Sequence, residues 1–258
     1  SVQHGSRSPA LPRLMIDKQT DPASLRYHVP VMALSDRVMF PGVRAFVELP
    51  RATFLKVQSL LREGRAGAIG LVAAQPGRGE LYRMGTLCRI VYVRATGQGS
   101  TRSAARGEAT EGREGVRLVL EGSCRFQLLH TAAQVSGLHS TTVRALEEGV
   151  EDASAAGLAL RVRGLVLELL AGCPQQPRWP SSASGLADAV GAALTSLPLQ
   201  QRQRVLETLG VTERLELVLS ILQAEVRRRR DGGAAGPSIA WPALEAQGAP
   251  QDARGAGR

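Results

Sequence analysis

Few side chains in this 258-residue sequence are spaced for nucleotide chemistry. A phosphate-binding P-loop places a lysine after a glycine and before Ser or Thr, so that the ammonium group neutralises the phosphates. The sequence has two lysines, Lys18 and Lys56, and neither follows a glycine. Two stretches, "GRGELY" at 77–82 and "GQGSTR" at 97–102, lack the third glycine of a dinucleotide-binding fingerprint and open no predicted helix. We therefore expect no nucleotide cofactor.

Cysteine and histidine are the other residues that could do chemistry. The sequence has no paired CxxC, HExxH or GxSxG motif, so we expect no metal ligands and no catalytic residues. Cys124 and His139 could meet in space as nucleophile and base, although a buried cysteine in a strand usually acts as a small apolar residue. Three widely spaced cysteines are typical of a reducing compartment rather than of a disulfide framework. The cysteines are Cys88, Cys124 and Cys173.

Positive charge is the most unusual feature of the composition. The formal net charge is +9, and its densest run is Arg227, Arg228, Arg229 and Arg230. Cations at the end of a helix are favoured by the exposed carbonyl groups there, so the run has a structural explanation. The alternative is an anion-binding patch for nucleic acid, but aromatic residues make up 3% of the sequence and leave little for base stacking. Nucleic acid would then bind only through attraction between its phosphates and the arginines.

The first half of the sequence alternates apolar and polar residues with the period of a strand. Pro30 cannot donate a ladder hydrogen bond, and it places the first strand at a sheet edge or near a strand end. Gly122 predicts a bend between two strands. The predicted strands cover 27–34, 44–50, 68–74, 85–93, 116–122, 124–129 and 138–146, and one covering helix lies between Pro50 and Gly64.

After Asp152 the apolar residues recur with helical spacing. Thr212 is a favourable N-cap residue for the last predicted helix. A linker rich in Pro and Ser at 173–184 separates the first of these helices from the rest. The predicted helices cover 157–172, 185–197, 198–210 and 213–230.

Strands followed by helices predict an α+β fold with segregated layers. We expect a mostly antiparallel, β-rich subdomain of six or seven strands at 27–148 and an α-helical subdomain at 149–230. Residues 1–26 and 231–258 lack periodicity and predict an N-terminal extension and a flexible C-terminal tail. The Gly-rich stretch at 95–115 predicts a loop.

No apolar run approaches the length of a membrane span, since the longest covers about seven residues. The first residue is not Met, and Arg7 and Arg13 precede any acidic residue, a pattern expected after removal of a targeting peptide. This favours an organelle, either mitochondrion or plastid, with the cytoplasm as the alternative.

Four stretches of the sequence resemble one known family, in the same order and at plausible spacing. The sequence is similar to the N-terminal substrate-recognition domain of Lon-type proteases over about residues 27–230. The stretches are "YHVPVMALSDRVMFPGV", "ELYRMGTLCRIVYV", "VRLVLEGSCRFQLL" and "QRQRVLETLGVTERLELVLSILQAEV". The residues that match the family pattern are Phe40, Pro41, Gly42, Tyr82, Gly85, Thr86, Ile90, Gly122, Arg125, Phe126, Gln203, Leu206, Glu207, Arg214 and Leu215.

The resemblance implies structural roles for these residues and a function in protein binding. Lon enzymes continue into an ATPase module and a Ser-Lys protease module. This sequence has no candidate for the lysine that either module requires, so we expect a stand-alone domain without catalysis. One interpretation is an adaptor that binds polypeptide clients in apolar grooves between the sheet and the helices. The alternative is an accessory subunit of a larger protein assembly, for which an organelle is one location.

Overall fold

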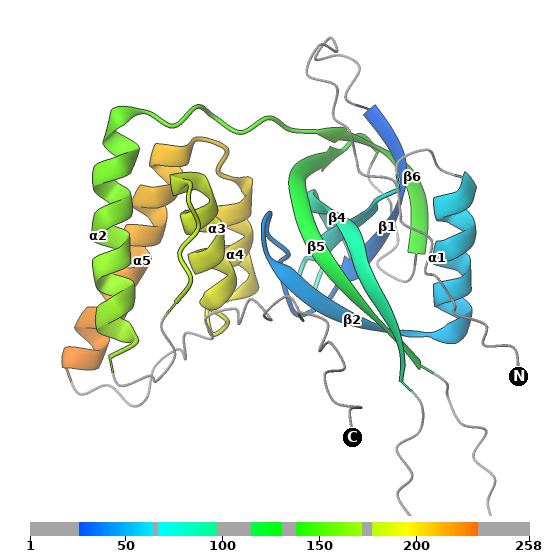
Figure 1. Cartoon of the computed structure of the whole chain (residues 1–258), viewed down its shortest axis with the longest axis horizontal. Coiled ribbons are helices and arrows are strands. Elements are labelled where there is room, and N and C mark those ends of the chain that lie inside the picture. The colour runs from blue at the N-terminus through cyan, green and yellow to red at the C-terminus, as the bar shows by residue number, and fades with distance from the viewer. Residues whose placement is uncertain (1–25, 64–66, 97–114, 131–137, 172–176, 232–258) are drawn as a thin grey trace, which may run out of the picture.

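A computed structural model of the chain describes residues 26–63, 67–96, 115–130, 138–171 and 177–231. Six strands and one helix form a first half, and four helices form a second half beside it (Figure 1). The prediction of an α+β fold with these two halves in this order is confirmed. The elements are β1 (Arg26–Leu34), β2 (Arg44–Pro50), α1 (Arg51–Glu63), β3 (Ile69–Ala74), β4 (Leu81–Thr96), β5 (Gly115–Leu128), β6 (Leu138–Ala145), α2 (Ala153–Leu169), α3 (Ala183–Ala193), α4 (Leu199–Glu207) and α5 (Val211–Arg230).

The six strands form one sheet in the order β2-β5-β4-β3-β1-β6. β5 also pairs with β6, so the sheet closes on itself into a small barrel. The β1–β3 pair is parallel, and the other pairs are antiparallel. β2 pairs only with β5 among the described residues and is therefore an edge strand.

Alternation along β5 decides which side chains fill the barrel. Val116, Leu118 and Leu120 are buried, whereas Arg117 and Glu121 point away from this core. Because successive side chains of a strand lie on opposite faces, this pattern fixes the register of β5 against both neighbours.

The division into two strands at Gly122 is wrong, because β5 runs through this residue as one strand. Its partner β4 spans 16 residues, and the hydrogen bonds to β4 continue on both sides of Gly122. At Gly122 the register of β5 against β4 shifts, because Leu87 pairs with Cys124 whereas Cys88 pairs with Gly122. One extra residue, Ser123, is accommodated there as a β-bulge.

Pro30 lies in an interior strand, because β1 has β6 on one side and β3 on the other. The prediction that Pro30 lies near a strand end corresponds to the end of the paired segment between β1 and β3. Pro30 is opposite Ser140 of β6, and pairing with β3 starts only at Val31. The missing N–H of the proline thus falls where β1 has a single neighbour.

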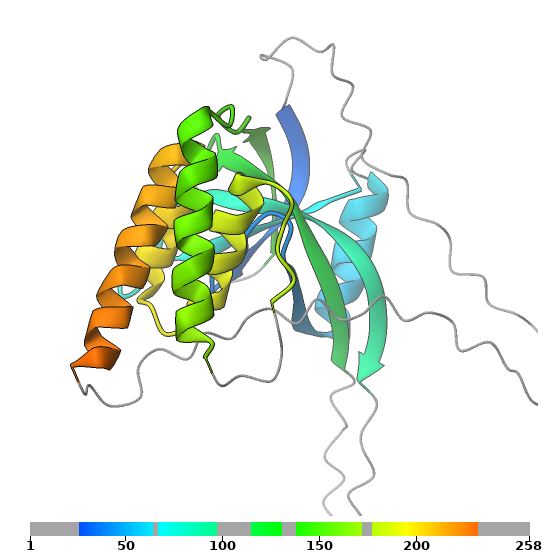
Figure 2. The same cartoon turned by 60° about the vertical axis from the view of Figure 1, so that its left-hand side comes forward.

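In the helical half, the long helices α2 and α5 lie side by side, and α3 and α4 lie between α5 and the barrel (Figures 1 and 2). Their apolar stripes form a core that includes Val162, Val166, Leu215 and Leu222. Asp152 caps α2 by accepting hydrogen bonds from the backbone N–H groups of Ser154 and Ala155, both at 3.0 Å.

The N-cap predicted at Thr212 is wrong. The last helix begins at Val211 with Gly210 as its N-cap residue, which places Thr212 inside the first turn. The hydroxyl of Thr212 instead donates to Oδ1 of Asp152 at 2.9 Å. Packing of α5 against α2 has therefore overridden the local capping preference.

Several expectations lie outside the described residues, namely those for 1–25, Gly64, 97–114 and 232–258. None of the helices in the described ranges combines the length and hydropathy needed to cross a membrane.

Candidate functional site

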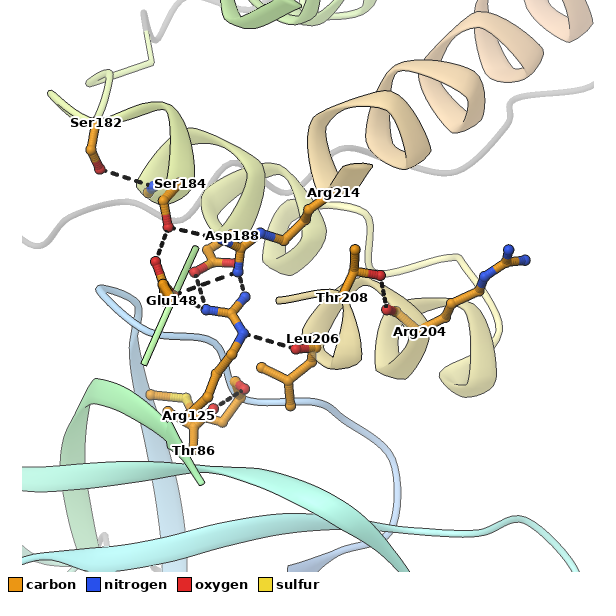
Figure 3. Close-up of polar contacts among 12 residues, drawn as sticks. Thr86, Arg125, Glu148, Ser182, Ser184, Asp188, Arg204, Leu206, Thr208 and Arg214 are labelled. Carbon is orange, nitrogen blue, oxygen red and sulfur yellow. Dashed lines mark hydrogen bonds and ion pairs between the residues drawn. The ribbon is translucent and has the colours of Figure 1, made fainter. Parts of the chain in front are cut away.

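The residues singled out by sequence gather mainly where the two halves meet. We call Arg125, Glu148, Ser184, Asp188 and Arg214 the junction cluster (Figure 3). Arg125 comes from β5, Glu148 from the connection between β6 and α2, Ser184 and Asp188 from α3, and Arg214 from α5. The cluster therefore joins the barrel to two helices.

Arg125 is the centre of the junction cluster, and its side chain is 0% exposed. Its guanidinium group forms a fork with the Asp188 carboxylate, with N–O distances of 3.0 and 2.5 Å. It also donates to Glu148 and, at 2.8 Å, to the backbone carbonyl of Leu206 in α4. Planar bidentate pairing of this kind orients both partners, which a lysine could not do.

Arg214 closes the cluster from the helical side, and its side chain is also fully buried. It lies 3.3 Å from Asp188 Oδ1 and 3.5 Å from Glu148 Oε1. It also donates to the Ser184 hydroxyl at 3.0 Å, and that hydroxyl donates to Glu148. Two arginines thus face two carboxylates, the buried Asp188 and the partly exposed Glu148, so the charges of the cluster balance.

Burial raises the pKa of the two carboxyl groups, whereas ion pairing with the arginines lowers it. Burial raises the pKa of the Asp188 carboxyl, and the guanidinium groups of Arg125 and Arg214 oppose this effect. Burial also opposes ionisation of Glu148, but the Ser184 hydroxyl and the two arginines outweigh it, so its pKa is lowered.

We expect Glu148 to link stability to pH. A carboxyl group whose pKa is lowered on folding stabilises the protein above its ordinary pKa of 4.5, and this contribution is lost as the pH falls through the folded-state value. Glu148→Gln should therefore lose less stability than the parent chain on acidification from about pH 7 to about pH 3. Urea unfolding at a series of pH values measures this.

The matched control is Glu147→Gln, because Glu147 is an exposed neighbour without an ion pair among the described residues. It should follow the parent curve. Asp188 is present in all three chains, but the Glu148 carboxylate contributes to its raised pKa, so the difference between the Glu148→Gln and parent curves reports the coupled pair. Identical acid profiles for Glu148→Gln and the parent would contradict the assignment.

The "FPG" sequence forms the corner that brings β1 and β2 to the junction. Gly42 has a φ of 71°, a left-handed conformation that favours glycine. Its N–H donates to the Gly122 carbonyl at 2.9 Å, and the Gly122 N–H donates to Val43 at the same distance. Phe40 is fully buried and belongs to the core of the helical half, although its chain segment comes from the barrel. Pro41 between them is half-buried.

The strand motifs lie inside the barrel wall. Phe126 is fully buried and pairs with Gly85 across β4 and β5. Thr86 is also fully buried, and its hydroxyl donates to the Met39 carbonyl at 2.7 Å. Ile90 packs against the barrel core, and Tyr82 packs against both the barrel and the helical core.

The helix motifs add a second link between the halves. Gln203 of α4 donates to the Met84 carbonyl of β4 at 3.0 Å and to Glu207 at 2.9 Å. Leu206 and Leu215 are buried in the helical core.

Sequence reasoning missed three members of the junction cluster, namely Glu148, Ser184 and Asp188. One signal for Asp188 was present: it stands within "LADAV", whose other four residues are all buried. A carboxylate in such a run needs a buried cationic partner. Glu148 and Ser184 carried no comparable signal, because Glu148 lies in the connection between β6 and α2 and Ser184 lies at the start of α3.

The outer surface of the barrel carries an exposed apolar row. Phe46 of β2 and Tyr92 of β4 are both opposite Val119 of β5, so the three side chains share one face. Phe46 is 52% exposed and Tyr92 46%, whereas Val119 between them is 7% exposed. We call these three residues the outer-face row.

Charged rows border the outer-face row on both sides. On one side Glu121 lies 2.8 Å from Arg44 and 3.0 Å from Arg89. On the other side Glu48 pairs with Arg117, whose guanidinium group lies 4.8 Å from the centre of the Phe46 ring.

Each half carries a surface hollow among the described residues. A hollow of about 300 Å³ lies beside β2 and is lined by Leu34, Phe46 and neighbouring residues. A groove of about 400 Å³ lies on the helical half, and we call it the α5 groove. It is lined by Leu194, Leu197, Gln201, Arg204, Leu217, Ser220, Ile221, Ala224, Glu225 and Arg228.

Each of these two hollows is lined by one half alone, so they do not test the expectation of apolar grooves between the sheet and the helices. Phe40, Arg125, Asp188 and Arg214 are buried where the two halves meet.

The arginine run at the end of α5 is largely engaged in local contacts. Arg228 and Arg229 pair with Glu225, and Arg230 pairs with Glu168 of α2 at 2.7 Å. Arg229 also donates to the Leu169 carbonyl at the end of α2. These contacts favour the structural explanation of the run, while binding of nucleic acid stays an untested alternative.

No group of three or more His, Cys, Asp or Glu side chains that could hold a metal ion occurs within the described ranges. Burial and the nearby Glu148 carboxylate raise the pKa of the Cys124 thiol to about 11. This thiol is therefore protonated at neutral pH, which disfavours the nucleophile alternative. The side chain of its candidate partner, His139, lies outside the described part of the structure.

Comparisons with known proteins agree with one another. The family profile "ATP-dependent protease La (LON) substrate-binding domain" matches residues 28–224. A Lon protease of Anaeromyxobacter dehalogenans is 26% identical over 234 residues, and Lon protease 2 of Myxococcus xanthus is 26% identical over 241 residues. These matches cover 83% and 84% of this chain but 25% and 26% of the relatives, so the chain spans about a quarter of their length.

Solved structures show the same fold. The N-terminal domain of a Mycobacterium avium complex Lon protease superposes with a TM-score of 0.54 at 20% identity, covering 76% of this chain and 98% of that domain. A Lon N-terminal domain protein from Xanthomonas campestris gives a TM-score of 0.53 at 19% identity, with 75% and 97% covered.

Proposed function

The chain belongs to the LON substrate-binding domain family, and from this premise we propose that it is a non-catalytic adaptor that binds polypeptide clients through the outer-face row. The family supports a role in substrate recognition. Our proposal adds an adaptor activity, in which the chain passes the bound client to another protein complex.

The exposure of the outer-face row is the observation that carries this proposal. Phe46 and Tyr92 keep about half of their surface in contact with water, on neighbouring positions of one sheet face. Clustered exposed aromatic side chains are typical of protein-binding surfaces, because their burial against a partner is favourable and costs little rotamer entropy. The hollow beside β2 extends this surface past Phe46.

The charges around the row indicate which clients it favours. Arg44, Arg89, Arg94 and Arg117 border it together with two glutamates, Glu48 and Glu121, which gives a net charge of +2. An apolar segment flanked by acidic residues is complementary to this surface, and the complementarity should increase the association rate.

We expect Phe46→Ser to weaken client binding about tenfold, since a well-placed aromatic anchor contributes more than about 1 kcal/mol to an interface. The measurement is fluorescence anisotropy of labelled, carboxymethylated α-lactalbumin, an acidic polypeptide that stays unfolded. The matched control is Leu160→Ser on α2, because Leu160 is 67% exposed and lies away from the row.

Equal losses for the two variants would show that the row is not the client surface. Absence of binding by the parent chain, combined with elution of the endogenous protein in a large complex, would favour the accessory-subunit alternative. Elution as a free monomer would argue against permanent incorporation.

A further inference from the structure

The α5 groove is separate from the outer-face row and is built from different chemistry. Leu194, Leu197, Leu217 and Ile221 give it an apolar floor. Arg204 and Arg228 stand at its border. A groove of about 400 Å³ with this lining is large enough to take a few apolar side chains.

The sequence after α5 contains one apolar island. Residues 232–258 are mostly Gly, Ala, Pro and polar residues, with the exception of "SIAWPALE" at 238–245. Ile239, Trp241 and Leu244 are the large apolar residues of this whole stretch. A solvated tail has no need of such a cluster, whereas a segment that docks on an apolar surface does.

The length of chain allows the island to reach the groove. The helix ends at Arg230, and Ile221 lies nine residues earlier, or about 14 Å along the axis at 1.5 Å per residue. Ile239 follows Asp231 by eight residue steps, and an extended chain of this length spans up to about 26–29 Å. The tail can therefore turn back beside α5 without strain.

The charge at the border of the groove agrees with docking of the island there. Glu245 is the last residue of the island, and it is the first acidic residue after Asp231. Arg204 has no acidic partner among the described residues, and it borders the groove on the side of α4. A carboxylate at the end of the docked island would meet this guanidinium group.

We propose that residues 238–245 of the same chain occupy the α5 groove as an intramolecular ligand, with Ile239, Trp241 and Leu244 on its apolar floor and Glu245 toward Arg204. Such a ligand keeps the groove covered until a competing polypeptide displaces it. This goes beyond client binding at the outer-face row and does not depend on it.

Trp241 reports on this contact in the full chain, because the sequence has a second tryptophan only at Trp179. In a Trp179→Phe chain we expect the acrylamide quenching constant of Trp241 to be roughly threefold smaller than in a free peptide of residues 232–248, since a docked aromatic ring is largely shielded. Ala224→Glu places a carboxylate in the groove and should raise the constant to the peptide value.

Matched variants keep the test independent of folding. Ala224 and Ala156 are both exposed helical alanines, so Ala156→Glu on α2 should leave the quenching constant unchanged. Ile239→Ser changes only the tail and should also raise the constant.

Three results would overturn the proposal. The first is quenching of Trp241 as in the free peptide; in that case, weaker binding of carboxymethylated α-lactalbumin by Ala224→Glu would assign the groove to clients instead. The second is no effect of Ala224→Glu, which would place the island elsewhere. The third is an increase in quenching on dilution, which would assign the groove to the tail of a second copy.

Discussion

Arg125→Met is expected to lower the free energy of unfolding by about 3 to 5 kcal/mol, because it leaves the Asp188 and Glu148 carboxylates facing a single arginine inside the protein. The loss of the hydrogen bond to the Leu206 carbonyl adds an unsatisfied acceptor. Urea unfolding followed by far-ultraviolet circular dichroism measures the change.

The control is the exposed ion pair between Arg230 and Glu168, whose side chains are 69% and 41% exposed. Arg230→Met should cost less than about 1 kcal/mol, since exposed pairs contribute little. In the double variant Arg125→Met, Asp188→Leu, the loss should be smaller than the sum of the two single losses, because the removed groups are each other's partners. Similar midpoints for Arg125→Met and Arg230→Met would refute a structural role for the cluster.

The second large effect is expected at Gly122, where the corner at Phe40 meets β5. A Cβ atom added to Gly122 would lie 2.1 Å from the Phe40 carbonyl oxygen and 2.9 Å from its carbon. The Phe40 carbonyl accepts a hydrogen bond from the Val43 N–H, and the corner is tied to β5 by the bonds from Gly42 to Gly122 and from Gly122 to Val43, so these backbone atoms cannot move aside cheaply. Gly122→Ala should therefore destabilise the protein by about 3 kcal/mol or more, the upper range of overpacking effects.

Gly157→Ala is the matched control for this substitution. Gly157 lies inside α2, and a Cβ atom there would meet nothing within 4 Å. Alanine at this position should raise the free energy of unfolding by roughly 0.5 to 1 kcal/mol, the helix-propensity difference. A neutral outcome for Gly122→Ala in thermal melts would mean that the corner shifts easily, contrary to the close contact.

The order of the elements was predictable because its signals are local. Alternation in β5 and helical spacing in α2 and α5 are visible in short windows of sequence. The errors occurred where a distant neighbour decided the outcome. β4 pairs with β5 on both sides of Gly122 and keeps it one strand, and packing against Asp152 draws Thr212 into the helix. Neither neighbour is apparent from the residues around the predicted feature.

The candidate site was predictable in a similar, partial way. Arg125 and Arg214 were named through the family resemblance, but no local pattern pairs them with Asp188 and Glu148, which are 63 and 23 residues away from Arg125. The outer-face row depends on which face of β2 and β4 meets solvent. That choice is made by the closure of the barrel and not by alternation alone.

The pairing of β1 with β6 has a consequence for synthesis on the ribosome. His28 meets Ser140 at 2.8 Å across 112 positions of the chain, so the barrel cannot close until residue 145 has left the exit tunnel. Arg125 must then wait for Asp188 and Leu206 to emerge. Nascent chains of this protein therefore expose unpaired strand edges and an incompletely paired arginine until α3 and α4 have left the tunnel, a state in which co-translational chaperones are expected to bind.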